Sequence, residues 1–124
     1  MAAYAAAERG SEVLLIEKMP GRPLGGATRM AVGTISAAGT QLQQAAGVQD
    51  DVETHFRDYL EFRTPGTRPE DYDLELTRLL VERSPATLQR LIDMGISYTE
   101  PHPEPTHTVE RMHIVDSGDH TRRL

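Results

Sequence analysis

The chain has 124 residues, no cysteine, and a formal net charge of −6 from 13 basic and 19 acidic side chains, which indicates one small acidic domain. This acidity argues against a nucleic-acid partner, and the lack of cysteine excludes disulfides, iron–sulfur ligation and thiol chemistry. No apolar run approaches the roughly 20 residues of a membrane span, and the N-terminus lacks the features of a secretory signal, so we expect a cytoplasmic protein.

The first 16 residues combine a helix pattern with a strand pattern. Residues 1–9, MAAYAAAER, favour a helix because alanine loses little conformational freedom there, and Gly10 stands where a glycine commonly ends one. Residues 13–16, Val-Leu-Leu-Ile, form a short and partly β-branched run, which predicts a buried parallel strand. Helix, glycine and strand in this order are typical of the back half of a βαβ dinucleotide-binding unit.

The front half of such a unit is a strand and a G-x-G-x-x-G turn, followed about 20 residues later by an acid. If Glu17 is that acid, the turn falls just before Met1. We therefore expect the chain to begin inside the first helix of a longer protein. The alternative is a natural start with an exposed alanine helix.

Glu17 and the loop after it are the best candidates for a ligand site. A carboxylate at the end of such a strand accepts hydrogen bonds from the ribose hydroxyls of an adenosine. Prolines and glycine at 20–23 then prevent regular structure, and residues 25–28 would offer backbone N–H groups to a pyrophosphate. A chain that stays small from Ala27 to Ala38 is suited to lie against a large flat group. The alternatives are a strand-ending acid, a surface loop, and close packing of a tight turn at Gly33.

Three short segments, Glu17-Lys18, Gly25-Gly26-Ala27-Thr28 and Ala31-Val32-Gly33-Thr34, carry a family resemblance. They resemble the second strand and following loop of the FAD-binding domain in the fumarate reductase/succinate dehydrogenase flavoprotein family. The similarity is greatest to its soluble fumarate reductase and 3-ketosteroid dehydrogenase branch, and it continues weakly to the last residue. Ala27 departs from the usual Asn, and Thr34 replaces the second glycine of a pair.

The resemblance implies an α/β fold: a partial Rossmann-like FAD-binding domain that lacks its first strand and glycine fingerprint, followed by an α-helical segment. Residues 1–38 would form the back half of the βαβ unit with the flavin loop, and 39–124 a mostly helical extension. The implied FAD contacts are Glu17, Lys18, Gly25, Gly26, Ala27, Thr28, Gly33 and Thr34. The flavin would be noncovalent, because residues 25–36 contain no His, Cys or Tyr. The substrate-binding residues would lie beyond Leu124.

The remaining sequence predicts helices. Residues 39–47 form a polar, helix-compatible connector, and Asp50 with Glu53 resembles a capping box. An amphipathic helix follows to about Arg63, with His55 on its exposed side and an apolar face of Val52, Phe56, Tyr59 and Leu60.

Two further helices are expected after residue 70. The first has an inward face of Leu76, Leu79 and Leu80. The second begins at Ser84-Pro85, where serine would cap it, buries Leu88, Leu91 and Ile92, and ends at Gly95. Residues 96–98 form a candidate short strand, and the prolines of 100–108 argue against regular structure.

The histidines His102, His107, His113 and His120 follow one another at intervals of five, six and seven residues. This spacing matches neither a helical face nor a zinc pattern, so we expect no metal site. Residues 111–113 and 118–120 resemble a region near the edge of the family's flavin domain, and we assign them no catalytic role.

Two functions from different classes are therefore open. The first is part of an FAD-dependent oxidoreductase that moves a hydride between flavin N5 and a substrate C–C bond, with small-molecule partners. The second is a non-catalytic remnant that holds no flavin and at most binds a partner. A module that binds NAD is a third, weaker option, because NAD enzymes do not need the glycine and small-residue run of 25–38.

Overall fold

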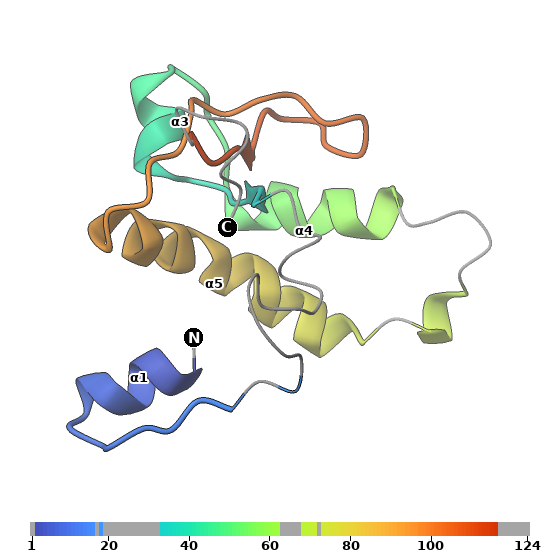
Figure 1. The fold of residues 1–124 in the computed structure, drawn as a ribbon. Coiled ribbons are helices and arrows are strands. Elements are labelled where there is room, and N and C mark those ends of the chain that lie inside the picture. The colour runs from blue at the N-terminus through green and yellow to red at the C-terminus, as the bar shows by residue number, and fades with distance from the viewer. Residues whose placement is uncertain (1, 17, 19–32, 63–67, 72, 117–124) are drawn as a thin grey trace. The chain divides into compact units, whose positions relative to one another are not determined.

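The computed structural model describes residues 2–16, 18, 33–62, 68–71 and 73–116 (Figure 1). The chain divides into two compact units, Met1–Ala31 and Val32–Leu124. Each unit is described separately below.

The N-terminal unit contains helix α1, Ala2–Glu8, which confirms the predicted alanine helix. Gly10 has a φ of +79°, a conformation that glycine adopts without strain. The Gly10 N–H donates to the Ala7 carbonyl at 2.9 Å, and the Ser11 N–H donates to the Ala6 carbonyl at 3.1 Å. These two bonds are those of a Schellman motif, so the predicted glycine stop is also confirmed.

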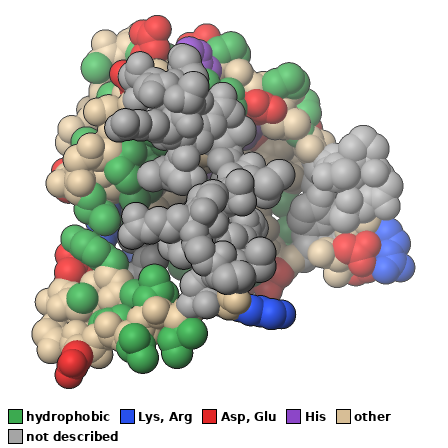
Figure 2. Space-filling model, viewed as in Figure 1, with side chains coloured by type: hydrophobic (Ala, Val, Ile, Leu, Met, Phe, Trp, Pro, Cys, Tyr) green, Lys and Arg blue, Asp and Glu red, His purple; other side chains and the backbone are tan. Residues whose placement is uncertain are grey.

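The predicted strand at residues 13–16 is not found. The run has no strand assignment, and Leu14 and Ile16 are 84% and 82% exposed. A strand needs a hydrogen-bonded neighbour and, in a parallel sheet, cover on both faces; none of the described residues pairs with this run. Figure 2 shows hydrophobic side chains on the surface of this unit.

The C-terminal unit is built on a two-stranded antiparallel sheet. Strand β1, Ile35–Ser36, pairs with β2, Met112–His113, and places Ile35 opposite His113. The Ala37 N–H extends the pairing by donating to the Arg111 carbonyl at 3.1 Å. The end of the small-residue run is thus buried in its own unit, because Ala37 and Ala38 are 0% and 1% exposed.

Helix α3, Gln41–Ala45, forms within the segment that the sequence describes as a polar connector. Thr40 caps it: the Gln43 N–H donates to Thr40 Oγ1 at 3.0 Å, and the Thr40 N–H donates to Gln43 Oε1 at 3.2 Å. This reciprocal pair is a capping box, which satisfies two backbone donors that the first turn would otherwise leave free.

Helix α4, Val52–Glu61, confirms the predicted amphipathic helix but not its cap or its faces. The cap is Asp51, which accepts from the Thr54 N–H at 2.7 Å, whereas the predicted cap, Asp50, binds Arg111 instead. His55 is buried, not exposed as predicted, and so is Asp58 one turn later. The physical reason is that Asp58 pairs with the buried Arg111, which turns that side of the helix inward.

Helix α5, Leu74–Asp93, is a single helix where the sequence suggests two (Figure 1). It follows the short 3₁₀ turn η1, Pro69–Asp71, and Asp73 caps it by accepting from the Leu76 N–H at 2.9 Å. Ser84 is not a cap; its hydroxyl donates to the Val81 carbonyl at 3.1 Å. That carbonyl is the acceptor for which Pro85 has no N–H to offer, so the serine lets the helix continue.

The predicted faces of α5 are correct only in its second half. Leu88 is buried as predicted, Leu91 and Ile92 of the predicted buried stripe are only half-buried, and Gly95, with a φ of +93°, ends the helix. The leucines expected inward in the first half are instead 46–61% exposed: Leu76, Leu79 and Leu80. The covered side carries Val81 and Ser84 because α5 packs against α4 and β1 along that line.

Residues 96–116 return along the unit without further helix. The predicted strand at 96–98 is reduced to one bridge between Tyr98 and Val115, and the proline-rich 100–108 lacks helix and strand, as expected. Among the described residues, no helix combines the length and apolar character needed to cross a bilayer.

Candidate functional site

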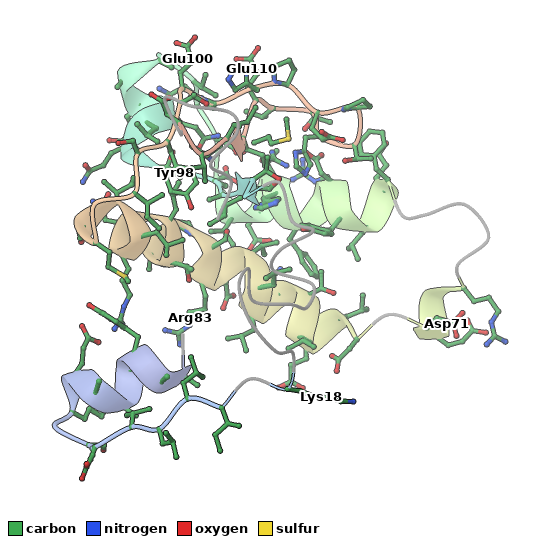
Figure 3. All side chains as sticks on the ribbon, in the orientation of Figure 1. Lys18, Asp71, Arg83, Tyr98, Glu100 and Glu110 are labelled. Atoms are coloured by element: carbon green, nitrogen blue, oxygen red, sulfur yellow. The ribbon has the colours of Figure 1, made fainter. Side chains whose placement is uncertain are left out.

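The residues predicted to contact FAD are only partly described by the structure. Glu17 and residues 25–28 lie outside the described residues. Lys18 is exposed (Figure 3). Gly33 and Thr34 lie just before β1, where Thr34 is exposed and Gly33 is half-buried.

Gly33 needs to be glycine for two local reasons. Its φ is +78°, and a Cβ there would lie 2.9 Å from Val115 Cγ2. A side chain would therefore be strained by the backbone and would collide with β-branched Val115. Close packing of a tight turn, the alternative to a cofactor contact at this position, is therefore enough to explain why residue 33 is a glycine.

A groove of about 950 Å³ opens beside Thr34 in the C-terminal unit. This volume is within the range of roughly 300–1,000 Å³ that small-molecule sites occupy. The groove is bounded by β1, α4, η1 and α5, and Figure 3 labels two of its lining residues, Asp71 and Arg83. Its main lining residues are Thr34, Ile35, Ser36, His55, Tyr59, Leu76, Leu79 and Leu80.

Beneath β2, a buried ion-pair cluster joins three distant segments. Arg111, 0% exposed, donates from Nε to Asp50 Oδ2 at 2.8 Å and from Nη2 to Asp50 Oδ1 at 2.9 Å. Its Nη1 donates to Asp58 on α4. Gln43 also donates to Asp50 at 2.9 Å and to the Glu110 carbonyl at 2.8 Å. The cluster thus fixes the start of β2 against α3 and α4.

Asp58 is held in its charged form by its partners. Burial pushes its pKa upward, but the Thr108 N–H at 2.8 Å, the Thr108 hydroxyl at 2.9 Å and Arg111 together keep the pKa below the usual range. No local spacing in the sequence links residues 50, 58 and 111, so the sequence alone does not predict this cluster.

The described histidines serve packing and hydrogen bonding. His55 lies between Tyr59 and His107, with ring centroids 5.2 and 5.6 Å away. Burial and then the Arg111 charge lower the pKa of His55 to about 4, so its ring is neutral at pH 7. His113 binds Thr40 Oγ1 at 3.0 Å and the Ile35 carbonyl at 3.2 Å. Within the described ranges, His, Cys, Asp and Glu residues form no group able to hold a metal ion.

The family follows from a match along nearly the whole chain. Residues 1–123 match the family model described as FAD binding domain. The chain belongs to this family. Its members are fumarate reductase-like FAD-dependent oxidoreductases, and their cofactor is FAD.

Two curated proteins and one solved structure give the family relationship more detail. The chain is 31% identical over 117 residues to NADH:fumarate oxidoreductase from Klebsiella pneumoniae (strain 342) and to the probable fumarate reductase Ifc3 from Shewanella frigidimarina (strain NCIMB 400). Each match covers 94% of this chain but only 12% and 19% of those proteins.

The open conformation of a flavocytochrome c3 fumarate reductase is similar with a TM-score of 0.79 and 29% identity, over 97% of this chain and 20% of that one. This similarity supports the predicted α/β FAD-binding fold for the chain.

The described part of the FAD-binding domain can be tested for fit to the cofactor. In the C-terminal unit, Thr34 is exposed and lines a groove of ligand size. In the N-terminal unit, Lys18 is exposed. Gly33 and Thr34 lie outside regular structure, where backbone groups are not all used by a sheet ladder. Thr34 is therefore accessible to a ligand, whereas Gly33 is accounted for by its φ and its packing against Val115.

Proposed function

We propose that this chain is part of a longer FAD-dependent oxidoreductase that transfers a hydride between flavin and a C–C bond of a small organic substrate. The reaction would be of the fumarate reductase or ketosteroid dehydrogenase type. The observation that carries the proposal is the family match over residues 1–123, joined by relatives that are themselves described as fumarate reductases. When bound, FAD supplies the redox chemistry, and the protein supplies orientation and electrostatics.

The proposed roles of the chain's own residues concern binding. Glu17 would accept hydrogen bonds from the adenosine ribose, with Lys18 beside it. Backbone N–H groups of Gly25, Gly26, Ala27 and Thr28 would bind the pyrophosphate side, and Gly33 and Thr34 would line the ring side.

We further propose that the flavin is held without a covalent bond. Residues 25–36 contain no His, Cys or Tyr that could attach it, and His55, the nearest histidine, is buried on α4 against Tyr59. Acid precipitation of the full-length flavoprotein should release flavin into the supernatant. Flavin fluorescence that stays with the washed pellet would overturn this proposal.

The competing proposal is a non-catalytic remnant, and one observation favours it. Residues 13–16 are exposed and unpaired among the described residues, although a working nucleotide-binding sheet would pair them. The remnant would retain no flavin in any context.

One experiment separates the two proposals. The full-length flavoprotein is reduced anaerobically and mixed with fumarate or with a ketosteroid whose carbonyl is conjugated to a ring C=C bond, so that either compound can accept a hydride and a proton across that bond, and flavin absorbance is followed. Reoxidation by either compound supports the oxidoreductase and identifies its type. A protein that binds no FAD, or whose reduced flavin reacts with neither compound, contradicts it.

A further inference from the structure

Helix α5 carries two apolar stripes, and only one of them is covered by the described part of the chain. The covered stripe contains Val81 and Leu88, which are 0% and 1% exposed, and it faces α4 and β1. The second stripe consists of Leu76, Leu79 and Leu80, which are 46–61% exposed. Apolar residues on more than one side are typical of a helix that packs on more than one side. The second stripe therefore calls for a partner.

The composition of this surface indicates a permanent contact. The three leucines line the groove of the C-terminal unit together with Ile35 and Tyr59. Surfaces that bind separate proteins reversibly draw most of their binding energy from Trp, Tyr and Arg, and leucine is under-represented among their strongest contacts. Permanent contacts are more apolar and resemble the core of a domain. Three leucines and an isoleucine in one lining fit the permanent kind.

The lengths of the relatives indicate where such a partner can come from. The match to the two curated relatives covers only 12% and 19% of their lengths, and the match to the solved fumarate reductase structure covers 20%. In the proposed longer protein, the substrate-binding residues are themselves expected beyond Leu124. That protein therefore has additional polypeptide available to cover the leucines.

We propose that the leucine stripe of α5 is an intramolecular docking surface, which an apolar segment of the polypeptide beyond Leu124 covers in the longer protein. The inference rests on the proposed function, because that function requires polypeptide there. Covalent attachment favours this occupant over a second copy or a separate protein. A tethered segment is present at an effective concentration on the order of millimolar, whereas a separate molecule loses its translational and rotational freedom on binding.

The test measures the accessibility of the three leucines by carbene footprinting and mass spectrometry. The full-length apoprotein, the FAD-loaded protein and the 124-residue chain are labelled in parallel, each over a range of protein concentrations. Leu88, which is 1% exposed in the same helix, is the internal standard for a covered leucine. Labelling of Leu76, Leu79 and Leu80 should be at least about fivefold lower in the full-length apoprotein than in the 124-residue chain, and should approach that of Leu88.

Four outcomes of the footprinting would overturn the inference. Equal labelling in the full-length apoprotein and the 124-residue chain would show that the stripe stays open. Protection that appears only with bound FAD would assign the surface to the cofactor, and protection that grows with protein concentration would assign it to a second copy. Leucines that are already protected in the 124-residue chain would be covered by residues of that chain.

Two variants give a matched comparison, since glutamine has nearly the helix propensity of leucine and methionine. Leu76, 61% exposed, lines the groove, whereas Met94, 42% exposed and directly after α5, does not. Leu76→Gln should raise the unfolded fraction at a fixed urea concentration by more than about tenfold in the full-length apoprotein, but by less than about threefold in the 124-residue chain. Met94→Gln should raise it by less than about threefold in both.

Equal effects of Leu76→Gln in the two proteins, or equal effects of the two variants in the full-length apoprotein, would also overturn the inference. Footprinting of the wild type decides the question if Leu76→Gln does not fold. Failure here leaves the proposed function standing, because FAD binding and reoxidation by substrate are measured separately on the full-length flavoprotein.

Discussion

The hydroxyl of Ser84 donates to the carbonyl oxygen of Val81 at 3.1 Å, in the turn of α5 where Pro85 has no N–H to donate. The bond is buried, because Ser84 is only 8% exposed. A side chain thus replaces a missing backbone donor and keeps 20 residues in one helix.

The first prediction follows from this replacement. Ser84→Ala should lower the free energy of unfolding by about 1–2 kcal/mol, because the Val81 carbonyl loses its partner in a buried site. In a Pro85→Ala background the new amide can donate to that carbonyl, so the same change should cost much less. Urea unfolding of the four proteins in this double-mutant cycle provides the measurement. Equal costs in both backgrounds would show that the serine does not replace the backbone donor.

A second prediction concerns the buried Arg111. Arg111→Ala should lower the free energy of unfolding by about 3–5 kcal/mol, because it leaves the carboxylates of Asp50 and Asp58 buried without their cation. Arg78→Ala is the control: Arg78 also makes a two-bond pair, with Glu53 at 2.7 and 3.0 Å, but in an exposed position. The control should lose far less stability. Similar losses for the two variants would contradict the structural role given to the cluster.

The third prediction is a pH dependence that originates at His55. Its pKa is about 4 in the folded chain and about 6.5 when unfolded, so the unfolded state takes up a proton first as pH falls. The contribution to stability is fully present above pH 6.5 and is lost as pH falls toward 4. Between pH 7 and 5 the loss should be up to about 2 kcal/mol. Burial lowers the pKa of His107 and His113 too, which adds a loss of the same sign.

The measurement is chemical denaturation at a series of pH values with wild type and His55→Phe. The variant cannot take up a proton at residue 55, so its stability should fall less steeply between pH 7 and 5. Parallel curves for the two proteins would assign the pH dependence to other groups.

A fourth prediction compares two glycines of the same unit. Gly33 and Gly47 have φ values of +78° and +75°, so alanine is strained at both. A Cβ at Gly47 meets nothing within 4 Å, whereas one at Gly33 meets Val115 at 2.9 Å. Gly47→Ala should cost about 1 kcal/mol, and Gly33→Ala clearly more because packing must also shift. Thermal unfolding of the two variants is the measurement, and a larger loss for Gly47→Ala would contradict it.

The sequence predicts correctly those helix ends that depend only on residues close by in the chain. The helix before Gly10 and the stop at Gly95 depend on residues within one or two turns, and both are found. The pairing of β1 with β2 and the contact of Arg111 with Asp50 join residues far apart in the sequence. No spacing rule reaches that far, so the sequence assigns the wrong side chains to the buried face of α4 and to that of the first half of α5.

The same limit applies to the candidate site. The strand at 13–16 was predicted from composition alone, but a strand also depends on a neighbour, and none of the described residues supplies one. Glycine motifs and the acid at position 17 indicated the FAD-binding family, because a cofactor loop is encoded by consecutive residues. The groove was not predicted, since its walls come from four separate elements.

The central proposal, that this chain supplies part of an FAD site through Glu17, is tested most directly by titrating the full-length apoprotein with FAD. Glu17→Ala should weaken binding by about 1.5–3 kcal/mol, or roughly 10- to 150-fold, as for the loss of hydrogen bonds to a charged group. Glu12→Ala removes an exposed acid five residues earlier and should leave the affinity unchanged. Equal FAD affinities for wild type and Glu17→Ala would contradict the proposal.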